Sequence, residues 1–196
     1  MTESEAERIV SQIERERFRY WRRSPAVYVR EWLPDGTWFE GFVVHAKNGK
    51  KAMEIDRLIR SKARKIVSKK VRKKMSQRKK AKAIAVGTAS ALSYKRFGKD
   101  VEGSTARNLK KNKGYCMIYA LVYQAACDRA GLKCKVAFGT ANGEEHAWNQ
   151  VSIGGKRRYV DACWYDASNG SGRYVLSSGL WRTHKLNELG TFYEYK

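Results

Sequence analysis

Residues 115–130, in the last third of the chain, are apolar along almost their whole length. They include one polar side chain, Gln124, before Asp128. A helix of this composition would be apolar on nearly every face, so it must lie at the centre of a core. Gly131 follows at the position where many helices end in left-handed backbone. With 42% apolar residues, the 196-residue chain can build such a core, as one domain with an extension or as two small domains.

Three segments after this helix have the patterns of β-strands. Residues 132–138 alternate apolar side chains with lysines, which is typical of a strand with one solvated face. Residues 145–153 and 156–164 give two more strands, and Gly154-Gly155 between them is typical of a hairpin turn. The central helix should therefore pack against an antiparallel sheet.

The hairpin determines which side chains share a face of that sheet. A two-residue loop at the glycines pairs Ile153 with Lys156, and side chains alternate between faces along each strand. Counting outward places four side chains on one face: His146, Trp148, Asp161 and Cys163. His146 and Asp161 are diagonal neighbours there, so we expect the imidazole to hydrogen bond to the carboxylate.

Cys116 lies in the first turn of the expected central helix, and Gly114 just before it allows a tight approach. Free backbone N–H groups and the positive end of the helix dipole favour a thiolate there. The backbone N–H of Cys116 can also stabilise an oxyanion. A thiolate, a histidine that moves protons and an aspartate that fixes its tautomer are what nucleophilic acyl transfer requires.

These residues resemble the transglutaminase-like superfamily, which are papain-like thiol enzymes with the Cys at the start of a helix and the His and Asp on following strands. The similarity covers about residues 104–166 and rests on four segments in this order: Gly114–Ala120, Gly131–Val136, His146–Asn149 and Tyr159–Asp161. It implies that Cys116 is the nucleophile, His146 the general base and then acid, and Asp161 the group that orients His146. Trp148 would then form a wall of the site.

The remaining cysteines and titratable residues have simpler interpretations. We expect Cys127, Cys134 and Cys163 to be buried core residues. The four cysteines form no C-x-x-C pair and have no nearby His at zinc-finger spacing, so we expect reduced thiols, no metal site and no cofactor. His45 and His184 have no partner evident from the sequence, and we expect surface or internally satisfied positions. Asp166 is a less favoured alternative to Asp161.

The N-terminal part has a different organisation. Residues 2–23 predict a helix, and residues 26–33 and 38–45 predict a β-hairpin around a Pro-Asp-Gly-Thr turn. We expect an α+β protein in which residues 1–90 form an extension with this hairpin and a long basic helix. Residues 91–196 would form the transglutaminase-like, papain-like catalytic domain, with residues 93–113 as a loop.

Residues 51–82 supply a net charge of +13 of the chain's +22, with fifteen Lys and Arg and two acids. Apolar residues at helical spacing run through this segment, so we expect one amphipathic helix with a cationic face. A face of one sign favours contact with a polyanion such as nucleic acid. The segment has no aromatic residue, so contacts would be to phosphates. The strongest candidates are Lys69, Lys70, Arg72, Lys73 and Lys74.

Two functions follow from these features. The first is a thiol enzyme that acts on amide acyl groups of a protein or peptide through an acyl-thioester, which water or an amine resolves. Peptide hydrolysis, deamidation and protein cross-linking remain open, because they differ in the substrate groove rather than in the triad. The second is a non-catalytic basic binding or assembly protein that uses the same fold to bind a polyanion.

The start of the chain has neither the basic n-region nor the apolar h-region of a signal peptide. The longest apolar stretch, Cys116–Tyr123, is far shorter than the ~20 residues that cross a bilayer. We therefore expect a cytoplasmic protein without a transmembrane segment, with export by a signal-independent route left open.

Overall fold

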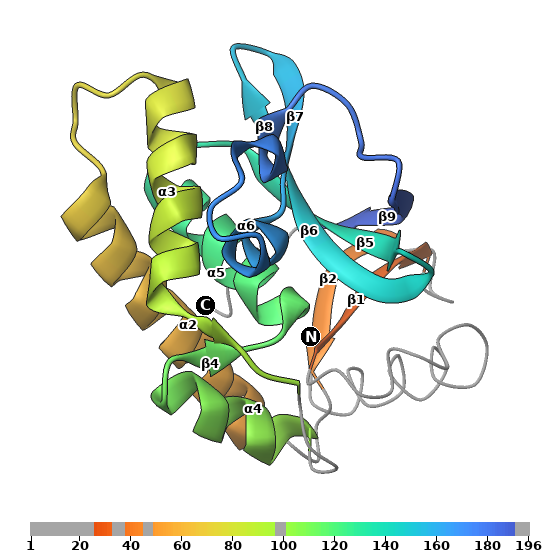
Figure 1. The fold of residues 1–196 in the computed structure, drawn as a ribbon. Coiled ribbons are helices and arrows are strands. Elements are labelled where there is room, and N and C mark those ends of the chain that lie inside the picture. Colours follow the sequence, from red (N-terminus) through yellow and green to blue (C-terminus); the bar gives the residue numbers. More distant parts are fainter. Residues whose placement is uncertain (1–25, 33–37, 45–48, 97–100, 191–196) are drawn as a thin grey trace.

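The computed structural model describes residues 26–32, 38–44, 49–96 and 101–190 (Figure 1). Its elements, in chain order, are β1 (Ala26–Trp32), β2 (Trp38–Val44), α2 (Gly49–Lys70), α3 (Gln77–Ala91), β3 (Ser93–Tyr94), α4 (Val101–Lys110), β4 (Lys113–Gly114), α5 (Cys116–Arg129), β5 (Cys134–Ala141), β6 (Glu144–Ile153), β7 (Lys156–Val160), α6 (Ala162–Ala167), the 3₁₀ helix η3 (Gly172–Tyr174), β8 (Val175–Ser177) and β9 (His184–Gly190). Among the helices described, none is both long and apolar enough to span a bilayer.

Helix α5 occupies the centre of the fold, as its apolar composition predicts. It packs against β5 and β6 of a five-stranded antiparallel sheet and against α2 and α3 on its other side (Figure 1). Residues 117–124 are all buried, and Gly131 just after the helix has φ of +73°. The sheet order is β8-β7-β6-β5-β9. The α+β class and the central helix against an antiparallel sheet are thus confirmed.

The outer face of the sheet carries a second apolar cluster. Ala137, Trp148 and Tyr159 are buried there, and the segment before β9 covers them with Leu180 and Trp181. We expected one solvated face along residues 132–138. Lys133 and Lys135 are exposed, but Ala137 on the same face is fully buried. The prediction of a solvated face was therefore wrong beyond the start of the strand.

The hairpin between β6 and β7 has the predicted register, with Ile153 opposite Lys156. Both Gly154 and Gly155 have positive φ, of 57° and 74°, which explains why this two-residue turn needs glycine. The predicted strand 156–164 is too long, because β7 ends at Val160 and Asp161 caps helix α6. Cys163 therefore lies in a helix rather than opposite His146.

The predicted N-terminal hairpin is confirmed, with Trp32 of β1 opposite Trp38 of β2. The predicted helix 2–23 lies outside the described residues. The predicted loop 93–113 was wrong, because it contains α4 and the short parallel strands β3 and β4. Ala106 and Leu109, three residues apart, bury the inner face of α4 in the core.

The basic segment 51–82 forms two helices instead of one. The Arg72 guanidinium donates to main-chain carbonyls at the end of α2, and Ser76 caps α3 by accepting from the Lys79 N–H. Four residues of the predicted apolar stripe are buried in α2: Ile55, Ile59, Ala63 and Ile66. They belong to the same core cluster as α3 and α5. The domain boundary at residue 90 stays a prediction.

Candidate active site

Cys116 is the first residue of α5, and Gly114 determines how closely the preceding strand approaches that helix. A Cβ atom at Gly114 would lie 2.7 Å from Cγ2 of Ile118, so no larger residue fits without a shift. Tyr115 occupies the N-cap position and makes no side-chain capping bond to the first turn. The Tyr115 side chain therefore leaves the first backbone N–H groups of the helix, next to Cys116, uncapped.

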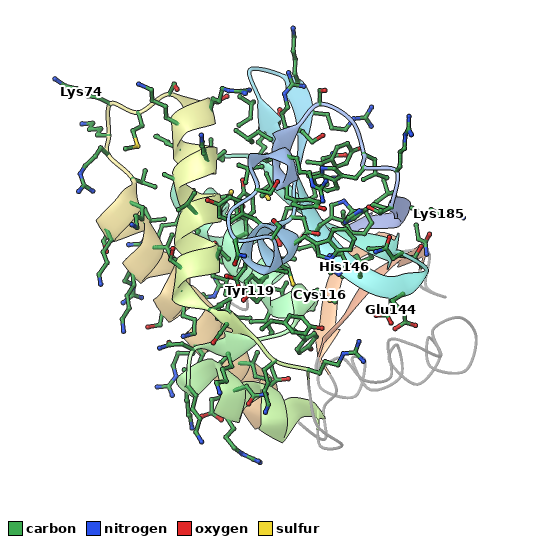
Figure 2. All side chains as sticks on the ribbon, in the orientation of Figure 1. Lys74, Cys116, Tyr119, Glu144, His146 and Lys185 are labelled. Atoms are coloured by element: carbon green, nitrogen blue, oxygen red, sulfur yellow. The ribbon has the colours of Figure 1, made fainter. Side chains whose placement is uncertain are left out.

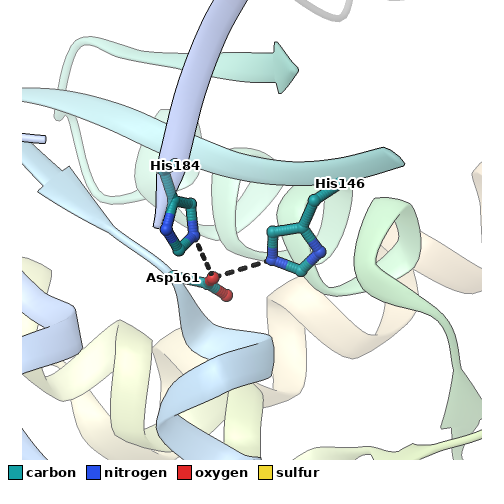
Figure 3. A group of neighbouring side chains, drawn as sticks. All are labelled: His146, Asp161 and His184. Atoms are coloured by element: carbon teal, nitrogen blue, oxygen red, sulfur yellow. Dashed lines mark hydrogen bonds and ion pairs between the residues drawn. The ribbon is translucent and has the colours of Figure 1, made fainter. Parts of the chain in front are cut away.

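His146 and Asp161 are hydrogen bonded, as the register of the hairpin predicts. Nε2 of His146 lies 2.8 Å from Oδ2 of Asp161 (Figure 3). The carboxylate is fully buried, and its other oxygen accepts from the Trp164 N–H at 2.9 Å as the cap of α6. Because a carboxylate only accepts, Nε2 of His146 carries a proton and Nδ1 is left to face another group.

The Cys116 thiol lies close to His146 (Figure 2) and interacts electrostatically with its imidazole. Burial lowers the pKa of His146, but the interactions with Asp161 and Cys116 outweigh it and raise the pKa to about 10. Burial likewise raises the pKa of Asp161, but the two histidine hydrogen bonds and the Trp164 N–H lower it overall. A protonated imidazole beside a cysteine favours the thiolate, which is the nucleophilic form.

A second histidine, His184, binds the same carboxylate and was missed by sequence reasoning. Its Nε2 lies 3.1 Å from Oδ2 of Asp161, and neither side chain is exposed (Figure 3). The Thr183 hydroxyl lies 2.9 Å from the other ring nitrogen. Of the two expectations for this residue, a surface position is wrong and an internally satisfied one is confirmed.

The pairing of β9 with β5 brings His184 to the site from the far end of the chain. At Gly139 of β5 an added Cβ would lie 1.8 Å from the Lys185 carbonyl oxygen, so only glycine permits this approach. The register shifts between Phe138 and Gly139, which marks a bulge at the same point. In the sequence, Gly139 indicates only that a close backbone approach is possible at this position. It does not indicate that β9 is the strand that approaches.

Three tryptophans enclose the two imidazoles. Trp148 stacks on His146 with ring centroids 6.0 Å apart and an interplanar angle of 22°. The Trp148 side chain is 1% exposed, so the wall that it forms lies against the imidazole and not on the open surface. The ring centroid of Trp164 lies 5.7 Å from that of His146 and 4.7 Å from that of His184. The ring centroid of Trp181 lies 4.7 Å from that of His184. These rings keep water from the hydrogen bonds to the carboxylate.

The other candidates from the sequence have different positions. Asp166 accepts a 2.6 Å hydrogen bond from the Tyr119 hydroxyl, whereas the carboxylate that bonds His146 is that of Asp161. The remaining cysteines are buried, as expected: Cys127, Cys134 and Cys163. Burial raises the pKa of Cys134 and Cys163. His45 lies outside the described residues.

Of the described residues of the site, Cys116 is the most accessible to solvent. Cys116 is partly exposed, whereas His146, Asp161 and His184 have side chains at most 8% exposed. Tyr94 of β3 is half exposed and interacts electrostatically with Cys116. Figure 2 shows His146 above Cys116, with Glu144 at the nearby end of β6. Tyr94 therefore forms part of the rim around the accessible side of Cys116.

The family model for the transglutaminase-like superfamily matches residues 64–167, which is more than half of the chain. The chain belongs to the transglutaminase-like superfamily. The match starts within α2, so the family region extends further toward the N-terminus than the residues 104–166 on which we based the resemblance. It includes Cys116, His146 and Asp161, whereas His184 lies beyond its end.

Solved structures similar to the chain include one described as a TGase, with 20% identity and a TM-score of 0.41, over 56% of this chain and 31% of that one. A candidate cysteine protease from Cytophaga hutchinsonii has 18% identity and a TM-score of 0.43, over 62% of this chain and 45% of that one. A candidate protease from Parabacteroides distasonis has 14% identity and a TM-score of 0.41, over 70% of this chain and 36% of that one. The chain therefore spans less than half the length of each. No curated protein matches it.

Three side chains of the transglutaminase-like site are of types that bind metal ions in other proteins. The ligand atoms of His146, Asp161 and His184 lie within 4.8 Å of one another. Both Nε2 atoms, however, donate to the same carboxylate oxygen, so neither offers a lone pair to a cation in this arrangement. The two histidines and the carboxylate thus form one hydrogen-bonded group.

The five basic residues singled out in the sequence lie away from this site. Lys69 and Lys70 end α2, whereas Arg72, Lys73 and Lys74 lie in the turn between α2 and α3. Figure 2 shows Lys74 pointing away from the body of the molecule. Binding of a polyanion by these residues stays a prediction.

Proposed function

We propose that this transglutaminase-like protein is a thiol enzyme that transfers acyl groups from amides of a protein or peptide, with Cys116 as nucleophile. One observation carries the proposal. His146 is held by Asp161 through Nε2 and interacts with the Cys116 sulfur, which lies at the start of α5. A nucleophile, a base and a group that orients the base thus follow one another, with His146 between the other two.

In the proposed reaction the Cys116 thiolate attacks the amide carbon, and the oxyanion that forms is stabilised by the Cys116 backbone N–H. The C–N bond then breaks as His146 gives its Nδ1 proton to the leaving nitrogen, which departs as ammonia or an amine. The resulting thioester is attacked by water or by a second amine. His146 takes the proton of that nucleophile, and the sulfur leaves again as thiolate.

Two neighbouring residues support these steps. His184 is proposed as a positioning residue, because it touches Asp161 and acts on the reaction only through that carboxylate. Tyr94 is proposed to contact the acyl donor, because it is half exposed beside the sulfur. Whether water or an amine completes the reaction depends on which of them reaches the thioester past this rim.

The test is amide turnover by purified variants, measured as release of ammonia or amine from glutamine-containing and plain peptides. Cys116→Ala and His146→Ala should each abolish turnover, and to a similar extent, because the members of a triad act as a unit. Asp161→Asn should cost less, since it disturbs the orientation of His146 without removing the base. Cys127→Ala is the matched control, and circular dichroism checks folding. Full turnover in folded Cys116→Ala would overturn the proposal.

A further inference from the structure

A groove between α2 and the end of α3 is lined by four lysines. Its volume is about 700 Å³, and the lysines come from one helix: Lys62, Lys65, Lys69 and Lys70. The rest of the lining combines small or polar residues with apolar ones: Gly87, Ser90, Ser93 and Asn112, and Ile66, Ala91 and Leu92. It lies apart from the thiol site, whose residues do not line it.

The close packing of the two helices forms the base of this groove. A Cβ at Gly87 would lie 2.7 Å from Cγ2 of Ile66 and 3.3 Å from Cγ of Lys70. Lys62, Lys65 and Lys69 follow each other at spacings of three and four residues, so they share one face and extend along roughly 10 Å of helix. A row of ammonium groups thus borders a concave surface.

The residue types in the lining indicate which class of anion fits the groove. Of the described residues that line the groove, none is acidic, so positive charge is not neutralised within it. Burial and the charge of Lys65 lower the pKa of Lys62, which is the expected effect of crowded ammonium groups. The lining also lacks arginine, the side chain that binds carboxylates in a two-pronged fashion, and aromatic rings on which bases stack. Lysine point charges suit phosphate groups.

We propose that the α2–α3 groove binds the phosphate backbone of a nucleic acid through Lys62, Lys65, Lys69 and Lys70, without base preference. Lys69 and Lys70 were also candidates from the sequence. The other three sequence candidates do not belong to the groove. Arg72 is occupied at the end of α2 by the carbonyls of Ser68, Lys69 and Val71. Lys73 and Lys74 lie outside the groove lining. The proposal is independent of the thiol chemistry.

Fluorescence anisotropy with a labelled single-stranded oligonucleotide of mixed sequence, titrated at several salt concentrations, tests this. The groove variant is Lys65→Gln/Lys69→Gln/Lys70→Gln, and the control is Lys73→Gln/Lys74→Gln/Lys79→Gln. All six lysines are exposed, so both variants should fold, and both lose three charges. The groove variant should bind about tenfold more weakly, and its slope of log affinity against log salt should fall by about two. The control should change less than about threefold.

Equal losses in the two variants would overturn the proposal, because they would show a general effect of net charge. Unchanged binding in the groove variant would overturn it as well. Polyglutamate of matched charge serves as competitor, and displacement of the oligonucleotide at equal concentration would assign the groove to acidic proteins instead. Cys116→Ala should bind the oligonucleotide like the natural chain, which separates this result from the fate of the proposed enzyme.

Discussion

Replacing His184 by Phe tests whether the second histidine acts through Asp161. The substitution keeps an aromatic ring among Trp148, Trp164 and Trp181 but removes the 3.1 Å hydrogen bond to the carboxylate. Hydrogen bonds to charged groups are worth about 1.5–3 kcal/mol, and here neither partner is exposed to water. If the whole free energy of this hydrogen bond is lost from the transition state, turnover falls about ten- to a hundredfold. His184→Gln, which can place an amide N–H near the same oxygen, should restore most of it.

The assay is kcat/KM for amide turnover as a function of pH, with urea unfolding of each variant alongside. The His184 hydrogen bond lowers the pKa of Asp161, so its loss should raise that pKa and move the acid limb of the activity profile to higher pH. A purely structural role would lower stability and leave the acid limb in place. Phe and Gln variants with the same profile as the natural chain would refute the reasoning.

Three further outcomes are expected. Iodoacetamide near neutral pH should alkylate Cys116 well before the three buried cysteines, as peptide mapping by mass spectrometry will show. The folded pKa of His146, about 10, exceeds its unfolded value near 6.5, so this group stabilises the fold below pH 6.5, and that stability is lost as pH rises toward 10. The free energy of unfolding, measured in urea, should therefore fall over this range by an amount of order a few kcal/mol, and the fall should disappear in His146→Gln. Gly114→Ala should destabilise the fold by about 1–3 kcal/mol and slow Cys116 alkylation, because its methyl overlaps Ile118, whereas Gly172→Ala, in open space, should do neither.

Each of these outcomes has a contrary result. Equal labelling of all four thiols would mean that Cys116 is not activated. A flat stability profile in the natural chain would mean that His146 does not gain a proton on folding. A fully stable and reactive Gly114→Ala variant would mean that the approach of β4 to α5 is not restrictive.

The site was predictable as far as local pattern determines geometry. The two glycines determine a hairpin register, and register with alternation places His146 near Asp161, as the 2.8 Å hydrogen bond confirms. The apolar composition of residues 115–130 requires burial on all sides, which places Cys116 at the start of a core helix. Both inferences depend on residues close together in the sequence.

The parts that sequence missed depend on capping and on long-range pairing. Asp161 is a good helix N-cap residue, and this local signal outweighed the apolar residues after it that suggested a longer strand. Ser76 likewise starts a new helix inside the basic segment. Helix α4 has few apolar residues, of which Ala106 and Leu109 pack in the core, so its pattern alone was too weak. His184 arrives through pairing of β9 with β5, for which no local pattern exists.

The most direct test of the central claim is the mass of the Cys116 peptide after brief incubation with a glutamine-containing peptide and rapid acid quench. The account predicts a thioester adduct on Cys116, with loss of ammonia from the donor and release of the adduct by hydroxylamine. Asp161→Asn should form less of the adduct, and His146→Ala should form none. An unmodified Cys116 under conditions in which glutamine or peptide bonds are turned over, or an adduct on another cysteine, would contradict the assignment of Cys116 as the nucleophile.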